Sequence, residues 1–212
     1  MVGLVNIQNQ RDCQILVVCQ TLRYFAKNIT MPSITFQPLK RLSPAEFLDF
    51  SLLNQGLICE MNANGSIILK TFKAKKYNQI AEKLRETLND WNNIHEEGVV
   101  FDMRIGYVLP NGAILHPTLS WIKAYKLNTQ KEHLIEAVPD FFVEFLTESD
   151  TVQAMKMRMK TYMLNGALLG WLIDKDNEKV YIFKNDGTEE EVEYLKKSIS
   201  GGVILRGYEF AF

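Results

Sequence analysis

Glu144 is the acidic residue with the most unusual surroundings in this sequence. It is the one charged residue in the apolar run Phe141–Leu146. Side chains alternate along a strand, so Phe142, Glu144 and Leu146 would share one face. An ionised carboxylate on a buried face is costly unless it is paired or binds a metal ion. Glu144 is therefore a candidate ligand or buried ion-pair partner, although a glutamate at a strand end can also meet water or a lysine.

Two further acidic residues stand in or after strand-like segments. Glu60 lies near the end of Leu57–Met61, and by itself it is typical of a solvated strand glutamate. Asp174 follows an apolar segment and most simply opens a turn, because an aspartate there can bond its own downstream backbone. Neither residue alone predicts a site.

Basic residues follow Glu144 on a predicted helix. Lys156 and Arg158 flank the apolar face of that helix on opposite sides, so one of them could reach back towards Glu144; a solvated helix edge is the alternative. Two basic clusters could contact phosphate groups or form solvated faces: Lys70, Lys73, Lys75 and Lys76, then Lys156, Arg158 and Lys160. His116 stands two residues before Thr118, which places both on one face of a predicted strand.

The elements that precede these residues are predicted from caps and turns. Ser43-Pro44-Ala45-Glu46 has the pattern of a helix start, with the helix running to about Leu53. The segments Leu57–Met61 and Ser66–Phe72 form a hairpin around Asn62-Ala63-Asn64-Gly65. Apolar spacing predicts a helix over Tyr77–Trp91.

The middle of the chain predicts strands. Val99–Leu109 and Ala113–Ile122 should pair antiparallel across a turn at Pro110-Asn111-Gly112, and Lys123–Ala137 reads as a loop or short helix. Phe141–Leu146 has the composition of a central strand that is buried on both faces.

The last third predicts a helix and further strands. Asp150 is the expected cap of a helix that ends at Asn165-Gly166. Strands are expected at Leu168–Asp174, Lys179–Phe183 and Val203–Leu205. The predicted class is α+β, with a mixed sheet that contains antiparallel hairpins and is flanked by helices.

Composition excludes several classes of protein. The 212 residues are 47% apolar and 23% charged, which is ordinary for a globular chain, and the net charge of −1 supplies no global attraction to nucleic acid. Cys13, Cys19 and Cys59 form no CxxC pair, which argues against a disulfide framework or zinc site and favours a cytoplasmic setting. No apolar run is long enough to span a membrane. No Walker loop, GxGxxG, HExxH or GxSxG motif is present.

The first thirty residues have no clear period. We interpret residues 1–30 as an N-terminal extension, either disordered or a non-native start, because Met31 begins a Met-Pro-Ser sequence that reads like a start. A docking helix over Asp12–Lys27 is the alternative. Residues 31–212 are predicted to form one domain.

One ordered set of motifs resembles a known family, the Uma-two family of restriction endonucleases within the PD-(D/E)XK nuclease superfamily. The resemblance covers roughly Leu42 to Phe212 and is strongest over Pro139–Asp174. Its motifs are Glu60 with Asn64-Gly65, Leu109–Ala113, His116–Trp121, Pro139–Glu144, Ser149-Asp150, Tyr162, Asn165-Gly166 and Leu169–Asp174.

The resemblance implies a restriction-endonuclease-like core and a site of carboxylates and a lysine around Mg²⁺ or Mn²⁺. Such cations take oxygen ligands, lower the pKa of bound water and neutralise charge on an attacked phosphate. The family's first and third acidic positions fall on Glu60 and Glu144, the implied metal ligands. The second, from a Pro-Asp-x-Ser motif, falls on Thr118. The helix lysine falls on Arg158, with Lys156 one half-turn earlier.

Thr118 and Arg158 depart from the family pattern. The threonine hydroxyl is a neutral, weak ligand, and arginine cannot give up a proton. Asp102 on the neighbouring predicted strand could supply a displaced carboxylate.

The prediction is therefore a divergent endonuclease-fold protein that resembles metal-dependent DNA phosphodiesterases, with activity reduced or lost. The alternatives are an active nuclease with an unorthodox third ligand and a non-catalytic binding or scaffold module, for which DNA or a second copy of the chain would be partners.

Overall fold

The computed structural model describes residues 33–54, 56–71, 78–127, 130–131, 133–194 and 198–212. The predicted extension 1–30, its alternative helix, and Lys73, Lys75 and Lys76 lie outside these residues. None of the helices within them is long and apolar enough to cross a membrane.

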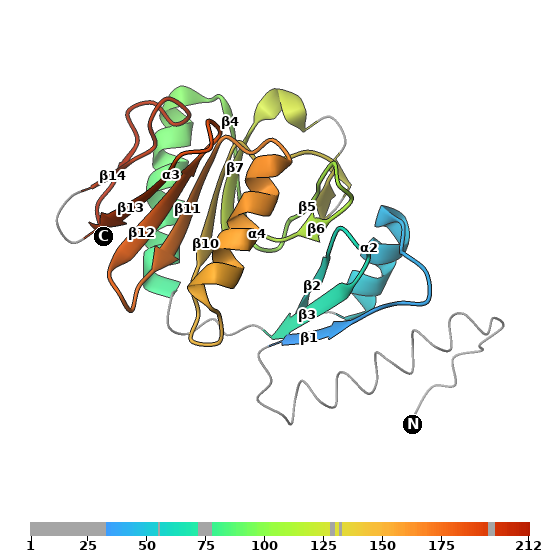
Figure 1. Ribbon diagram of the computed structural model, residues 1–212. Coiled ribbons are helices and arrows are strands. Elements are labelled where there is room, and N and C mark those ends of the chain that lie inside the picture. The colour runs from blue at the N-terminus through green and yellow to red at the C-terminus, as the bar shows by residue number, and fades with distance from the viewer. Residues whose placement is uncertain (1–32, 55, 72–77, 128–129, 132, 195–197) are drawn as a thin grey trace, which may run out of the picture.

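Two mixed sheets organise the described chain (Figure 1). The six-stranded sheet has the order β13-β12-β11-β10-β7-β4, and the seven-stranded sheet has the order β1-β3-β2-β6-β5-β9-β8. A two-stranded sheet pairs β14, Ile199–Ser200, with β15, Glu209–Phe210. The α+β class predicted from the order of strands and helices is confirmed.

The six-stranded sheet is built from β4 (Gly98–Asp102), β7 (Leu119–Lys123), β10 (Phe141–Phe145), β11 (Leu169–Asp174), β12 (Lys179–Lys184) and β13 (Glu189–Glu193). Every residue of β10 is buried, and β10 pairs parallel with β11 and antiparallel with β7. This confirms the prediction of a central strand, because a strand covered on both faces needs an almost continuous apolar run.

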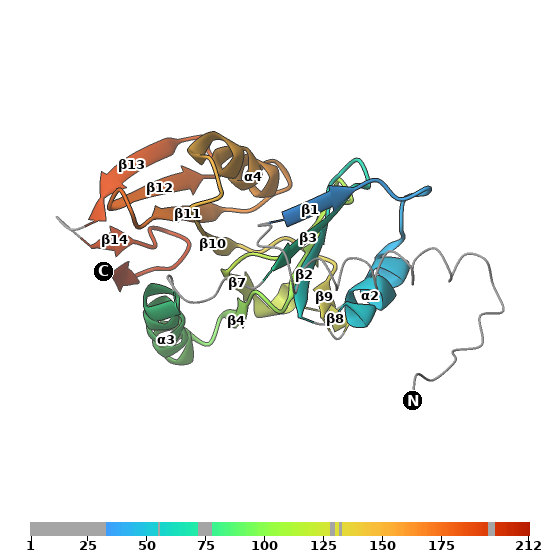
Figure 2. The same cartoon turned by 90° about the horizontal axis from the view of Figure 1, so that it is seen from below.

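Helices α3 and α4 cover opposite faces of this sheet (Figure 2). Helix α3, Asn78–His95, packs Leu84, Leu88 and Trp91 against one face, together with the C-terminal segment. Helix α4, Val152–Leu164, packs Met155, Met159 and Tyr162 against the other. Since α4 follows β10 directly, its start lies close to the end of the strand that carries Glu144.

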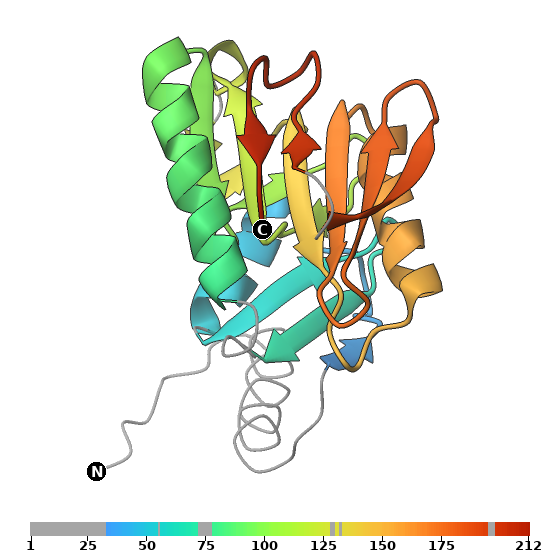
Figure 3. The same ribbon diagram turned by 90° about the vertical axis from the view of Figure 1, so that its left-hand side faces the viewer.

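The seven-stranded sheet contains β1 (Ser33–Phe36), β2 (Leu57–Met61), β3 (Ile67–Thr71), β5 (Gly106–Val108), β6 (Ile114–Leu115), β8 (Gln130–Lys131) and β9 (Leu134–Ile135). Helix α2, Pro44–Leu53, buries Phe47 and Phe50 against it. The hairpin β2–β3 lies across one end of the six-stranded sheet (Figure 3). Side chains of β2 can therefore meet side chains at the strand ends of the other sheet.

The predicted long hairpin of Val99–Leu109 and Ala113–Ile122 is divided between the two sheets. β4 pairs antiparallel with β7 in one sheet and β5 with β6 in the other. One arm breaks where the Asp102 side chain and carbonyl accept the N–H groups of Arg104 and Ile105. The other breaks at Pro117, which has no N–H for a ladder. The prediction of two continuous strands was wrong because both arms carry a local turn.

Three smaller predictions need correction. Thr151, not Asp150, caps α4 by accepting the N–H of Ala154, while Asp150 accepts the N–H of Thr147. Residues 203–205 form a turn instead of a strand, between glycines that adopt positive φ. The 123–137 segment contains a short 3₁₀ helix, η1 (Ala124–Lys126), and also β8 and β9.

The start of α2 follows the predicted capping box and generates a test. The Ser43 hydroxyl accepts the N–H of Glu46, and the Glu46 carboxylate accepts the N–H of Ser43. Ser43→Ala should lower the free energy of unfolding by about 1 kcal/mol in chemical denaturation. Ser51→Ala, within the same helix, is the control and should change it by less than about 0.5 kcal/mol. Equal effects would show that the cap is not what stabilises the helix start.

Candidate functional site

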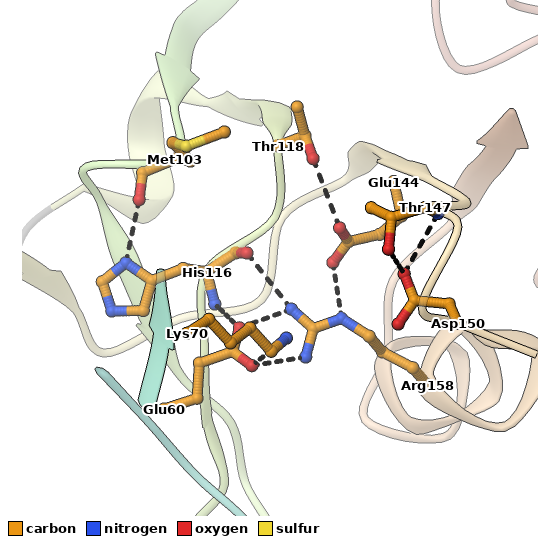
Figure 4. A network of polar contacts seen from close by, with 9 residues as sticks. All are labelled: Glu60, Lys70, Met103, His116, Thr118, Glu144, Thr147, Asp150 and Arg158. Atoms are coloured by element: carbon orange, nitrogen blue, oxygen red, sulfur yellow. Dashed lines mark hydrogen bonds and ion pairs between the residues drawn. The ribbon is translucent and has the colours of Figure 1, made fainter. Parts of the chain in front are cut away.

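A cluster of four charged side chains joins the two sheets (Figure 4). Glu60 comes from β2, Glu144 from the buried strand β10 and Arg158 from α4. Lys70 comes from β3. The link between β6 and β7 adds His116 and Thr118 at the rim. We call Glu60, Lys70, Glu144 and Arg158 the ion cluster.

The guanidinium of Arg158 lies between the two carboxylates. Its Nε donates to Glu144 Oε1 at 2.7 Å, and its Nη1 donates to Glu60 Oε2 at 2.8 Å. Its Nη2 donates to Glu60 Oε1 at 2.5 Å and to the carbonyl oxygen of His116 at 3.1 Å. Arginine suits this position because its planar fork presents donors from three nitrogens in fixed directions, whereas the donors of a lysine ammonium all lie on one nitrogen.

Glu60 holds as many polar contacts as Arg158. Besides Arg158, its Oε2 lies 2.7 Å from Lys70 Nζ, and its Oε1 accepts the backbone N–H of His116 at 3.0 Å. Its side chain is only 1% exposed. Burial alone would raise the pKa of Glu60, but the charges of Arg158 and Lys70 outweigh that effect and hold its pKa well below the ordinary value.

Glu144 has fewer partners and a different electrostatic balance. Its Oε1 accepts from Arg158, and its Oε2 accepts the Thr118 hydroxyl at 3.4 Å. Burial raises the pKa of Glu144, and the attraction of Arg158 only partly offsets that rise. Glu144 and Glu60 in turn raise the pKa of Arg158 well above its ordinary value, against the opposing effect of burial. The guanidinium therefore stays charged at every physiological pH.

His116 supports the ion cluster through its backbone. Its ring Nδ1 lies 3.0 Å from the carbonyl oxygen of Met103. Because a carbonyl only accepts, Nδ1 must carry the proton and Nε2 a lone pair. Nε2 is buried without a hydrogen-bond partner, and burial lowers the pKa of this imidazole, so it is neutral. The backbone N–H of His116 donates to Glu60, and its carbonyl oxygen accepts from Arg158. The ring, hydrogen-bonded to Met103, therefore helps to hold this backbone in place beside the ion cluster.

The predicted site residues separate into two groups. Glu60, Thr118, Glu144 and Arg158 come together, as the resemblance implies. Lys156 lies apart, with its Nζ 2.5 Å from Glu189 Oε1 and 4.2 Å from the centroid of the Tyr181 ring. Whether the grouped residues are catalytic, and whether the carboxylates ligate metal, stay predictions.

Asp102 does not supply the displaced carboxylate considered for this site. Its Oδ1 and Oδ2 accept hydrogen bonds from Nε and Nη2 of Arg104. Oδ1 also accepts the backbone N–H of Arg104. The carboxylate is thereby committed to the turn that ends β4.

Lys70 is a site residue that motif reading did not single out. In the hairpin register Glu60 faces Ile68, and Lys70 is two residues further along β3, on the same face. Counting outward from the Asn62–Gly65 turn would have placed it diagonally opposite Glu60. The sequence places Lys70 next to Lys73, Lys75 and Lys76, so it was grouped with them and its position beside Glu60 was missed.

The oxygens that could hold a divalent cation do not fit one as they stand. They are the carboxylates of Glu60 and Glu144, the Thr118 hydroxyl and the His116 carbonyl, and the guanidinium already contacts three of these four groups. In the part of the chain that the structure describes, no group of three or more His, Cys, Asp or Glu side chains could hold a metal ion. The side chain of Arg158 thus takes the space between the carboxylates.

A separate pocket opens beside α2. It has a volume of about 390 Å³ and is lined mainly by apolar side chains of α2 and β2, with Arg104, His116 and His133 at its polar side. Glu60, Glu144 and Arg158 are not among its lining residues.

Comparisons with known proteins identify a family from the sequence and a related fold from the structure. The Uma2 (Uma-two) family model, described as "Putative restriction endonuclease", matches residues 44–212. A crystal structure of a putative nuclease belonging to DUF820, from Anabaena variabilis ATCC 29413, superposes with a TM-score of 0.64 and 15% sequence identity. The match covers 72% of this chain and 86% of that chain. No curated protein matches.

Removing one carboxylate tests how much the ion cluster stabilises the fold. Glu60→Gln leaves Arg158 and Lys70 facing a single carboxylate in a buried setting. We expect a loss of roughly 3–5 kcal/mol in the free energy of unfolding at pH 7, measured by urea denaturation. The control is Glu189→Gln, which breaks the ion pair with Lys156. Because the Glu189 side chain is 28% exposed, the free energy of unfolding should fall by at most about 1 kcal/mol. Equal losses would mean that the ion cluster does not hold the sheets together.

The lowered pKa of Glu60 predicts acid sensitivity with a definite sign. Its folded pKa lies below the unfolded value of about 4.3, so its stabilisation is present above about pH 4.3 and is lost as pH falls towards the folded pKa. The stability gap between the native chain and Glu60→Gln should therefore shrink on acidification below about pH 4.3. Denaturation curves over a pH series measure this gap. A gap that stays constant with pH would show that ionised Glu60 is not its source.

Proposed function

Because the chain belongs to the Uma2 family of restriction-endonuclease-like proteins, we propose that it is a divergent nuclease whose phosphodiesterase activity is reduced or lost. The observation that carries the proposal is the guanidinium of Arg158, hydrogen-bonded to both Glu60 and Glu144. The divergence concerns the charges of the site and leaves the nuclease fold in place.

The charge balance of the site supports this proposal. Glu60 and Glu144 supply two negative charges, and Arg158 and Lys70 supply two positive charges, so the ion cluster sums to zero. Hydrolysis of a phosphodiester needs positive charge near the phosphate and an activated water. The ion cluster has no excess positive charge to stabilise a phosphate. Its carboxylates are already bonded to Arg158 and Lys70, so they are not free to bind a metal ion or to activate water.

Thr118 adds a second obstacle to catalysis. Where the family pattern has an aspartate, the Thr118 hydroxyl donates to Glu144 at 3.4 Å. A hydroxyl brings no charge to a cation and is a weak ligand. Mg²⁺ or Mn²⁺ is the cofactor, and DNA the substrate class, that we propose for an active form of the site.

A non-catalytic binding or scaffold module is the second candidate. The hydrogen bonds between Glu60 and Arg158 favour it, because they connect β2 of one sheet to α4 on the other sheet. This contact stabilises the fold and requires no catalytic role. Met157 and Leu164, 56% and 88% exposed, stand seven residues apart on the outer face of α4. Two apolar side chains at that spacing share a helix face and would suit a second copy of the chain or another protein partner.

Reversing both departures tests the nuclease proposal. The variant Thr118→Asp/Arg158→Lys restores the third carboxylate and withdraws the bridging guanidinium. We expect it to nick supercoiled plasmid in Mg²⁺ or Mn²⁺ at least about tenfold faster than the native chain, which corresponds to about 1.4 kcal/mol of activation free energy. Thr118→Asp alone should gain little, because Arg158 still lies between the carboxylates.

The control adds Glu144→Gln to the double variant and should abolish the gain, which also excludes a contaminating nuclease. Melting temperatures confirm that each variant is folded. Cleavage by the native chain as fast as by the double variant, and removed by Glu144→Gln, would overturn the proposal. No cleavage by either the native chain or a folded double variant would favour the scaffold candidate.

A further inference from the structure

The oxygens around Arg158 form a cage of the kind that surrounds a bound cation. Three carboxylate oxygens and the His116 carbonyl oxygen accept its N–H groups at distances of 2.5–3.1 Å. They come from three separate chain segments, so they converge only in the folded protein. Carboxylate and carbonyl oxygens are also what hard divalent cations select, and this cage already contains a positive group that belongs to the chain.

The burial of the cage makes a cation necessary. The side chains of Glu60 and Glu144 are 1% and 7% exposed, and that of Arg158 is 13% exposed. Two carboxylates so close together and so well buried repel each other and lose hydration, and both costs fall only if positive charge lies between them. Lys70 contacts Glu60 and lies at the more exposed side of the cage. Arg158 is therefore the residue that neutralises both carboxylates.

Truncating Arg158 would leave oxygen ligands without their counter-ion. Two negative charges would face the single positive charge of Lys70, a net charge of −1, and the space of the guanidinium would be empty. Glu144 would keep only the Thr118 hydroxyl among the contacts described above. A small divalent cation with bound water can enter such a space and contact carboxylates from both sheets.

We infer that the guanidinium of Arg158 acts as a built-in replacement for a divalent cation, so that the native chain is stable without metal. It follows that Arg158→Ala converts the cage into a Mn²⁺ site made of Glu60 and Glu144. The inference rests on the proposed function for the family's metal position, but its consequences are stability and binding, not cleavage. A failure of the plasmid assay therefore leaves it open to its own test.

Thermal unfolding with chelator or with Mn²⁺ is the main measurement. In chelator, Arg158→Ala should melt roughly 6–20 °C below the native chain. At a Mn²⁺ concentration of about 100 times its Kd, the variant should recover roughly 5–10 °C, while the native melting temperature should not move. Titration calorimetry should find one equivalent of Mn²⁺ bound by the variant and none by the native chain in the same concentration range.

Two controls separate this site from general cation effects. Arg104→Ala removes an arginine that also bonds a carboxylate, that of Asp102, but its side chain is 79% exposed. It should show no Mn²⁺ response. Adding Glu144→Gln to Arg158→Ala should remove the recovery in Mn²⁺, because the second carboxylate ligand is lost.

Each result decides the inference. A native chain that binds one equivalent of Mn²⁺, abolished by Glu144→Gln, would overturn it, because the guanidinium would not be occupying the position. Destabilised Arg158→Ala that gains nothing from Mn²⁺ would overturn it as well. If Arg158→Ala is unfolded in chelator, refolding with Mn²⁺, followed by circular dichroism, should restore the native signal; no refolding would contradict the inference.

Discussion

Two buried carboxylates from different sheets require a positive charge between them, and this constraint organises the rest of the structure. Glu60 and Glu144 lie at the meeting point of the sheets, where both are buried and where each would repel the other. Arg158 satisfies both, and Lys70 completes the neutralisation. Removing one member of a buried ion network lowers the free energy of unfolding strongly, because it leaves an unpaired buried charge. The members of the ion cluster therefore depend on one another.

The surrounding architecture makes this arrangement possible. The buried strand β10 delivers Glu144 into a dry setting, and the helix that follows it returns over the sheet, which brings Arg158 above the strand. The break at Pro117 lets one hairpin serve both sheets and places the backbone of His116 against Glu60 and Arg158. The turn that holds Asp102 and the break at Pro117 are thus features of the site as much as of the fold.

Membership in the Uma2 family and the fold of a nuclease coexist here with a neutral centre. The residues at the family's first, second and third acidic positions and at its helix lysine position, as the resemblance maps them, lie together, and two of the four carry no negative charge. The apolar layers formed by α3, α4 and the six-stranded sheet require that the central carboxylates be neutralised, but the neutralising group can be an arginine as well as a metal ion. Catalysis is less tolerant, since it needs unoccupied ligands and unbalanced charge.

The sequence by itself determined the local elements and part of the membership of the site. The capping box at Ser43, the apolar run around Glu144 and the turn at Asn62–Gly65 are short-range signals, so they predicted α2, β10 and the β2–β3 hairpin. The resemblance to the family grouped Glu60, Thr118, Glu144 and Arg158, with Lys156 as a further candidate. Only the tertiary structure decided that Arg158, and not Lys156, lies between the carboxylates, that Lys70 joins them and that Asp102 does not. Those outcomes depend on strand register and helix rotation, which arise when distant segments pack together and which no local pattern encodes.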